Sequence, residues 1–176
     1  MNILPYLKTG KLIVLYAPHA ACEESATLAA ELALRGLATV LDGGNRFAPY
    51  RVAQLLRRKT VDVVTASKHL LIRRAFTCYE MNSLLADTPT LHQSYMILDL
   101  LNTFFDDHVP AYEVCRLLKL CLGQIQRLQS SAPVVVTLAP PLVEERAFLI
   151  KQVCEKADEV FIPDLPALQV MQPVLF

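Results

Sequence analysis

The sequence predicts an α/β fold of three layers, in which helices cover both faces of a largely parallel sheet. Short apolar segments of strand length alternate with longer segments of helical periodicity, which is typical of strands joined by crossover helices. The chain has 176 residues, the length of one domain. No linker, internal repeat or low-complexity segment interrupts it, so we expect residues 1–176 to form a single domain.

Six short apolar segments are typical of strands, and five longer segments have helical periodicity. The predicted strands are Leu12–Tyr16, Ala38–Asp42, Leu70–Arg74, Tyr95–Leu100, Val134–Leu138 and Glu159–Ile162. The predicted helices are Glu24–Arg35, Pro49–Arg58, Tyr79–Ala86, Tyr112–Gln129 and Leu142–Lys156. In the longest of these helices, apolar residues recur at three- and four-residue spacing, so one side of the helix should face the sheet.

The overall composition excludes a strongly basic or acidic protein, because Lys plus Arg and Asp plus Glu each number 17. The five cysteines are widely spaced and form no C-x-x-C pair, which argues against disulfides or a zinc ribbon and favours a reducing cytoplasm. No apolar run approaches the roughly 18 residues that cross a membrane, so we expect a soluble protein without a membrane partner.

The chain is nevertheless unusually apolar. Hydrophobic residues make up 53% of it and charged residues only 19%, whereas about a quarter of the residues in an average soluble domain are charged. We therefore expect a protein partner or a second copy of the chain to cover part of its apolar surface.

The segment Leu12–Ala29 has the pattern strand, turn, helix, which is where a nucleotide-binding domain carries its phosphate loop. A working loop reads G-x-x-x-x-G-K-[ST], because the glycines let the backbone wrap the phosphates, Lys neutralises them and the hydroxyl binds magnesium. The corresponding positions in this chain are Ala17, Cys22, Glu23 and Glu24. Two carboxylates would repel a triphosphate, so we expect no cofactor and a turn closed by its own side chains.

Four further segments of the sequence have recognisable patterns. Residues 40–51 match part of the pattern of a strand-end Asp followed by T-E-G-x-F-x-P-x-R, and the matching residues are Asp42, Phe47, Pro49 and Arg51. Residues 70–81 contain Arg-Ala-Phe after an apolar strand. Residues 95–99 form an apolar strand that ends in an aspartate, and residues 134–139 form another that ends in Leu138 and Ala139.

In this order, the segments resemble the core of the RecA/RadA recombinases over roughly residues 12–162. The resemblance implies a RecA-like sheet of the P-loop NTPase superfamily, with Asp99 as the Walker B aspartate. It also implies that Gly44 replaces the glutamate that activates water, and that Leu138 and Ala139 replace the polar sensor pair. The residues that bind and hydrolyse ATP are therefore absent except for Asp99.

Three functions remain open. The first is a non-catalytic RecA/RadA-like protein that binds a protein partner or DNA, in DNA repair or recombination or in its regulation. The second is an atypical ATPase in which Asp99 holds magnesium and Arg46 or Arg51 replaces the lost cation of an ATP site. The third is an enzyme that uses His19 and Cys22, since a thiol at a helix start has a lowered pKa.

Asp42 and Asp99 are expected at the carboxyl ends of neighbouring strands, where open α/β sheets bind ligands. Because no phosphate loop presents a nucleotide there, a structural role such as helix capping is the simpler prediction for both residues.

One local charge excess lies between residues 46 and 74, where eight cations accompany a single acid, Asp62. It could follow a nucleic-acid backbone or form a solvated face or protein interface. The eight residues are Arg46, Arg51, Arg57, Arg58, Lys59, Lys68, Arg73 and Arg74.

Overall fold

The computed structural model describes residues 3–141 and 144–162, and it confirms the predicted α/β fold with three layers. Within these residues, six parallel strands form one sheet in the order β3-β2-β4-β5-β1-β6. The strands are β1 (Leu12–Tyr16), β2 (Ala38–Asp42), β3 (Leu70–Arg74), β4 (Ser94–Leu98), β5 (Val134–Leu138) and β6 (Glu159–Phe161).

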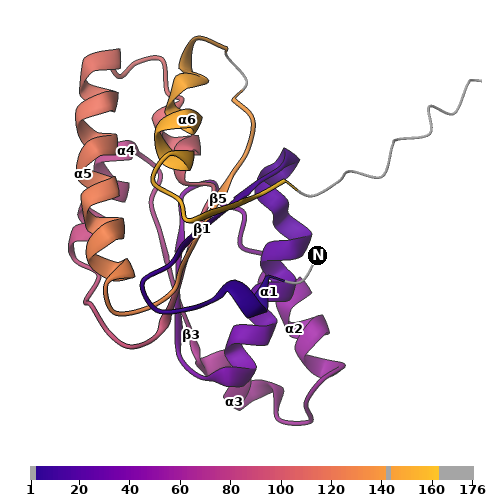
Figure 1. Ribbon diagram of the computed structural model, residues 1–176. Helices are drawn as coiled ribbons and strands as arrows, with labels where there is room; N and C mark the ends of the chain where they lie inside the picture. Colours follow the sequence, from indigo (N-terminus) through magenta and orange to yellow (C-terminus); the bar gives the residue numbers. More distant parts are fainter. Residues whose placement is uncertain (1–2, 142–143, 163–176) are drawn as a thin grey trace, which may run out of the picture.

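Two groups of helices cover the two faces of this sheet (Figure 1). The first group consists of α1 (Cys22–Arg35), α2 (Pro49–Arg57) and α3 (Val63–Lys68). The second consists of α4 (Cys78–Ala86), α5 (Ala111–Gln129) and α6 (Phe148–Cys154). Short 3-10 turns occur at η1 (Leu4–Tyr6), η2 (Pro18–Ala21), η3 (Leu100–Phe104) and η4 (Glu144–Arg146).

The alternation of side chains along each strand divides the core into two parts. In β1, Leu12 and Val14 belong to the cluster under α4, α5 and α6, whereas Ile13 and Leu15 belong to the cluster under α1, α2 and α3. All four side chains are buried, as expected for a parallel sheet covered on both faces.

The structure corrects the predicted elements at three places. Sequence reasoning missed α3, which begins after Asp62, whose carboxylate accepts a hydrogen bond from the backbone N–H of Thr65 at 3.1 Å. The predicted strand 95–100 ends at Leu98, because the chain turns at Asp99 with φ of 49°. The predicted helix 142–156 is shorter: its first two residues lie outside the described part, and the rest forms η4 and α6.

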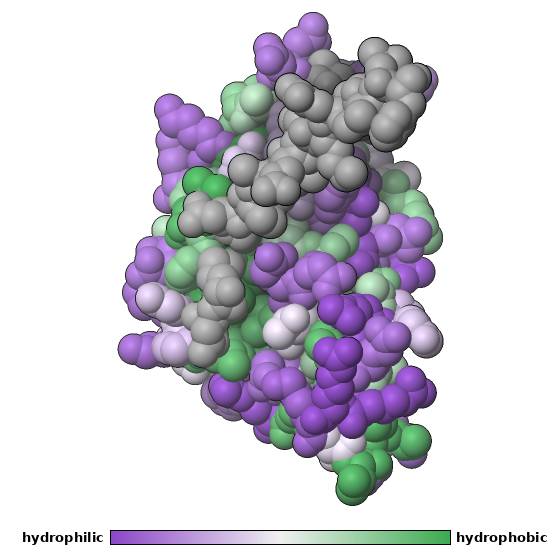
Figure 2. Space-filling model, turned by 90° about the vertical axis from the view of Figure 1, so that its right-hand side faces the viewer, coloured by the Kyte–Doolittle hydropathy of each residue, from purple (hydrophilic) through white to green (hydrophobic). Residues whose placement is uncertain are grey.

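The surface mixes polar and apolar residues. On the face that Figure 2 presents, the hydrophobic residues outside the grey atoms form separate patches between hydrophilic ones. In the described part of the chain, no helix is both long enough and apolar enough to cross a membrane.

Candidate functional site

The two aspartates selected from the sequence lie side by side at the carboxyl edge of the sheet, as predicted. Asp42 is the last residue of β2, and Asp99 directly follows β4, which pairs with β2 in parallel. Both are almost completely buried, with 0% and 1% of the residue exposed. A buried carboxylate needs hydrogen-bond donors, so their partners indicate what each one does.

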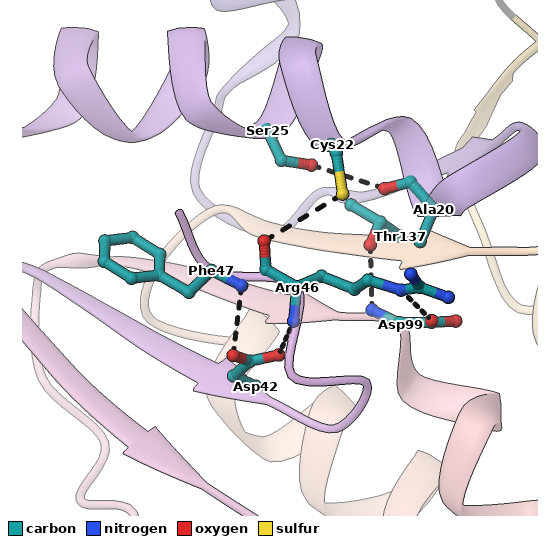
Figure 3. A network of polar contacts seen from close by, with 8 residues as sticks. All are labelled: Ala20, Cys22, Ser25, Asp42, Arg46, Phe47, Asp99 and Thr137. Carbon is teal, nitrogen blue, oxygen red and sulfur yellow. Dashed lines mark hydrogen bonds and ion pairs between the residues drawn. The ribbon is translucent and has the colours of Figure 1, made fainter. Parts of the chain in front are cut away.

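Both carboxylate oxygens of Asp42 accept hydrogen bonds from the loop after β2 (Figure 3). Its Oδ1 accepts from the backbone N–H of Arg46 at 2.8 Å, and its Oδ2 accepts from the backbone N–H of Phe47 at 3.1 Å. Oδ2 also accepts from Nε of Arg74, at the end of the neighbouring strand β3, at 3.1 Å. The carboxylate therefore fixes the loop after β2 and joins it to β3. The contacts of Asp42 are those of a structural residue, but the example of helix capping does not apply, because α2 begins only at Pro49.

Asp99 has fewer partners. Its Oδ2 accepts from Nε of Arg46 at 3.0 Å, while Oδ1 has no hydrogen-bond partner among the described residues. Its backbone N–H donates to the hydroxyl of Thr137 on β5 at 2.8 Å. Burial raises the pKa of Asp99 above its usual range, although Arg46 and the backbone N–H of Ala139 act in the opposite direction. The side chain makes no capping bond to η3, so helix capping does not apply to Asp99 either.

The position expected for a catalytic glutamate has no room for a side chain. A Cβ atom added to Gly44 would lie 2.4 Å from Oδ2 of Asp99 and 2.5 Å from its Cβ. Real Cβ atoms do not approach other atoms this closely, so Gly44 is required for the loop after β2 to pack on Asp99.

The turn between β1 and α1 is wound in a left-handed sense. His19, Ala20 and Ala21 have φ angles of 54°, 52° and 52°, a conformation that non-glycine residues rarely adopt. The backbone N–H of Ala20 donates to the carbonyl of Ala17 at 3.0 Å, and Ala17, Ala20 and Ala21 are buried. The turn is thus closed on itself, and helix α1 begins at Cys22 with Glu23 and Glu24 in its first turn.

The prediction of a lowered pKa for Cys22 is wrong. Burial raises the pKa of this thiol, and the nearby Arg46 only partly opposes the effect. The thiol donates toward the backbone carbonyl of Arg46 at 3.9 Å, and no hydrogen bond joins it to His19 in the described part of the chain. This arrangement does not activate a nucleophile.

A hollow of about 570 Å³ opens at the same edge of the sheet, and we call it the edge hollow. Its walls come from the segments that follow β1 to β5, an arrangement typical of ligand sites in open α/β sheets. Residues that line it include His19, Arg46, Phe76, Asp99, Asp106 and Ala139. The predicted residues Asp99 and Arg46 therefore meet at this hollow, whereas Asp42 lies behind them and contacts the loop backbone.

No family model matches this chain, and no curated protein is similar to it. Its function must therefore be argued from its own residues. Within residues 3–141 and 144–162, no group of three or more His, Cys, Asp or Glu side chains has the geometry of a metal site.

Half of the eight basic residues are paired with acids of the same chain. Four of them form ion pairs: Arg46 with Asp99, Arg51 with Glu23, Lys59 with Glu31, and Arg74 with Asp42. The other four, which form no ion pair within the described part, are Arg57, Arg58, Lys68 and Arg73. The sequence thus overstates the positive potential available to a nucleic acid.

Sequence reasoning missed the partners of the two aspartates. The pairing of Arg74 with Asp42 follows from strand register, because β2 and β3 have equal lengths and these two residues are opposite each other. The contact between Thr137 and Asp99 needed the strand order, which places β5 next to β4.

Proposed function

We propose that this chain is a non-catalytic RecA/RadA-like module that acts by binding a protein partner, in DNA repair or recombination or in its regulation. The resemblance supplies the process, and the site supports the loss of catalysis. The observation that carries the proposal is the ion pair between Arg46 and Asp99, packed over Gly44. A protein cation occupies the aspartate that would hold magnesium, and no side chain can stand where the general base would be.

The turn before α1 supports the same proposal. Glu23 and Glu24 place two carboxylates where a nucleotide site needs Lys and a hydroxyl, and Arg51 is paired with Glu23. Binding a triphosphate there would require repulsion by these carboxylates to be overcome. A protein partner is favoured over DNA, because half of the expected basic surface is neutralised by acids of the same chain.

The edge hollow favours one second candidate, an atypical nucleotide-binding protein. The hollow lies where open α/β sheets bind ligands, and its volume of about 570 Å³ is in the range of small-molecule sites. In that case, Arg46 would leave Asp99 and contact a phosphate.

Titration calorimetry with MgATP, together with a phosphate-release assay, separates the two candidates. We expect no binding heat at millimolar nucleotide and no turnover. The double substitution Glu23→Lys with Glu24→Thr should also remain inactive, because Gly44 still provides no general base. Micromolar affinity of the unaltered protein for ATP would overturn the proposal.

A further inference from the structure

An exposed phenylalanine, Phe76, lines the edge hollow, and two exposed tyrosines, Tyr79 and Tyr112, lie on the helices that follow segments lining it. Phe76, which lines it, is 73% exposed, and Tyr79 and Tyr112, at the starts of α4 and α5, are 48% and 76% exposed. The two tyrosines are close enough for Tyr112 to contribute to the raised pKa of Tyr79, whose main cause is desolvation. Exposed aromatic residues grouped around a concave surface are typical of protein interfaces.

The backbone that carries Phe76 is held in place by the start of α4. The hydroxyl of Thr77 accepts from the backbone N–H of Glu80 at 3.1 Å, and the carboxylate of Glu80 accepts from the backbone N–H of Phe76 at 2.7 Å. This reciprocal capping orders the segment that carries Phe76, so its exposed ring needs little further ordering when it is covered.

The wall of the edge hollow is acidic. Asp106 and Asp107 are exposed in the loop before α5, and hydrogen bonds from His108 hold the pKa of Asp106 below its usual range. Two cations are near these carboxylates: Arg46 is paired with Asp99, and Arg146, whose charge also lowers the pKa of Asp106, donates to the backbone carbonyls of Phe104 and Val109. The two loop carboxylates therefore give the hollow an excess of negative charge, which attracts a cation and repels a phosphate.

The floor of the hollow holds a buried acceptor without a hydrogen-bond partner among the described residues, beside Arg46, whose Nε donates to the other oxygen of Asp99. Asp99 lines the hollow, and its Oδ1 has no hydrogen-bond partner within the described residues. An occupant that brings N–H donors would match this floor better than one that brings further acceptors.

We propose that the edge hollow and its aromatic rim, Phe76, Tyr79 and Tyr112, are the docking site for a different polypeptide that inserts a lysine or arginine side chain. The cationic head lies against Asp106 and Asp107, and the alkyl stem and head pack against the rings. This inference rests on the proposed function, because a hollow filled by a nucleotide would not be free for a partner.

The test uses the full chain, ¹⁵N-labelled, with the tripeptides Gly-Arg-Gly and Gly-Lys-Gly at millimolar concentration as probes. We expect both to shift backbone resonances of Asn102, Asp107 and Tyr112. Matched tripeptides with norleucine or glutamate in the centre should leave these resonances unchanged. Binding of the glutamate peptide in place of the basic ones would overturn the inference.

Two pairs of variants locate the interaction. Asp106→Asn with Asp107→Asn should weaken binding of the arginine peptide by about tenfold, because it removes two charge contacts. Asp87→Asn with Glu155→Gln makes the same change in net charge at the opposite edge of the sheet and should leave affinity within about twofold. Equal weakening by the two pairs would mean a general charge effect and would overturn the inference.

The aromatic rim has its own control. Phe76→Ala with Tyr112→Ala should weaken binding by about fivefold, since cation–π contacts at exposed sites are modest. Tyr50→Ala removes a ring that is 70% exposed on the other face of the sheet and should have no effect. If the rim variant binds the peptides as tightly as the unaltered chain, the rim takes no part and the inference is wrong.

Two further outcomes have definite meanings. Resonance shifts with MgATP would overturn the proposed function, whereas silence toward both ATP and the basic peptides would overturn this inference alone. Sedimentation of a dimer that Asp106→Asn with Asp107→Asn dissociates would assign the hollow to a second copy of the chain and overturn the choice of a different partner.

Discussion

An aspartate stands at the end of β2 and another at the end of β4, but the two carboxylates differ in their hydrogen-bond partners. Asp42 receives three hydrogen bonds, two of them from backbone N–H groups, and both of its oxygens are used. Asp99 receives one side-chain hydrogen bond from Arg46, and its Oδ1 is left without a partner in the described structure. A carboxylate satisfied by backbone donors is part of the fold, whereas one whose side-chain partner is a half-exposed arginine can exchange that partner.

The largest effect on stability is expected when the fully hydrogen-bonded carboxylate of Asp42 is changed. Asp42→Asn should lower the free energy of unfolding by about 3 kcal/mol. The amide loses the ion pair with Arg74. Its NH₂ group also faces an N–H group that donates a hydrogen bond to Asp42 in the unaltered chain, so two donors oppose each other. Urea denaturation measures this loss. Asp87→Asn, an exposed residue whose side chain forms no hydrogen bond within the described part, should change stability by less than about 0.5 kcal/mol.

A loss of less than about 1 kcal/mol for Asp42→Asn would show that the loop after β2 does not depend on the carboxylate. The distinction between the two aspartates would then have no energetic basis.

The second test changes the contact between the two loops. Gly44→Ala should cost about 2 kcal/mol, because its Cβ would overlap Oδ2 and Cβ of Asp99 and force the loops apart. The control is Gly123→Ala in α5, where an added Cβ meets nothing within 4 Å, and it should raise stability by about 0.5–1 kcal/mol.

Thermal unfolding of a double mutant checks the cause. Asp99→Gly removes the side chain that the added methyl group at position 44 would strike, so Gly44→Ala should cost much less in that background than in the unaltered chain. Equal costs in the two backgrounds would mean that the strain arises elsewhere in the loop.

The sequence predicted most of the fold because the strands are short, apolar and buried on both faces. What it missed has physical causes. Helix α3 was missed because it begins with the β-branched residues Val63, Val64 and Thr65, which favour strands over helices. Its main helical signal in the sequence is the N-cap residue Asp62. In the interrupted helix before β6, Arg146 donates to the backbone carbonyls of Phe104 at 2.6 Å and Val109 at 2.8 Å, and periodicity cannot reveal such tertiary contacts.

The site was predictable in its positions but not in its contacts. Periodicity placed Asp42 at the end of a strand, whereas the resemblance placed Asp99 there, since the strand predicted from periodicity ran on to Leu100. The prediction that the two strands are neighbours in a parallel sheet is confirmed. The ion pair of Arg46 with Asp99 joins residues 53 positions apart, and Gly44 matters only through its distance to Asp99. The raised pKa of Cys22 also depends on burial, which the helix-start argument ignored.

The smallest expected effect belongs to Asp99. At pH 7, Asp99→Asn should change the free energy of unfolding by less than about 1 kcal/mol, because relief from burying a charge offsets loss of the ion pair. The side chain of Arg46 is 36% exposed and can remain hydrated without its partner. This result would contrast with the large loss expected for Asp42→Asn.

The dependence on pH sharpens the contrast further. Burial raises the pKa of Asp99 in the folded chain, so between the unfolded value near 4 and the raised value the folded state binds more protons than the unfolded state. The stability contribution of Asp99 should therefore fall as pH rises through this window, and Asp99→Asn should remove that fall. Carboxyls with lowered pKa, such as Asp106 and Asp158, act in the opposite direction, but they are common to both proteins and cancel in the difference.

Urea titrations of both proteins at a series of pH values from about 4 to about 7 give this difference directly. Unaltered protein that gains stability relative to Asp99→Asn as pH rises would show that Arg46 satisfies Asp99 as fully as the backbone satisfies Asp42.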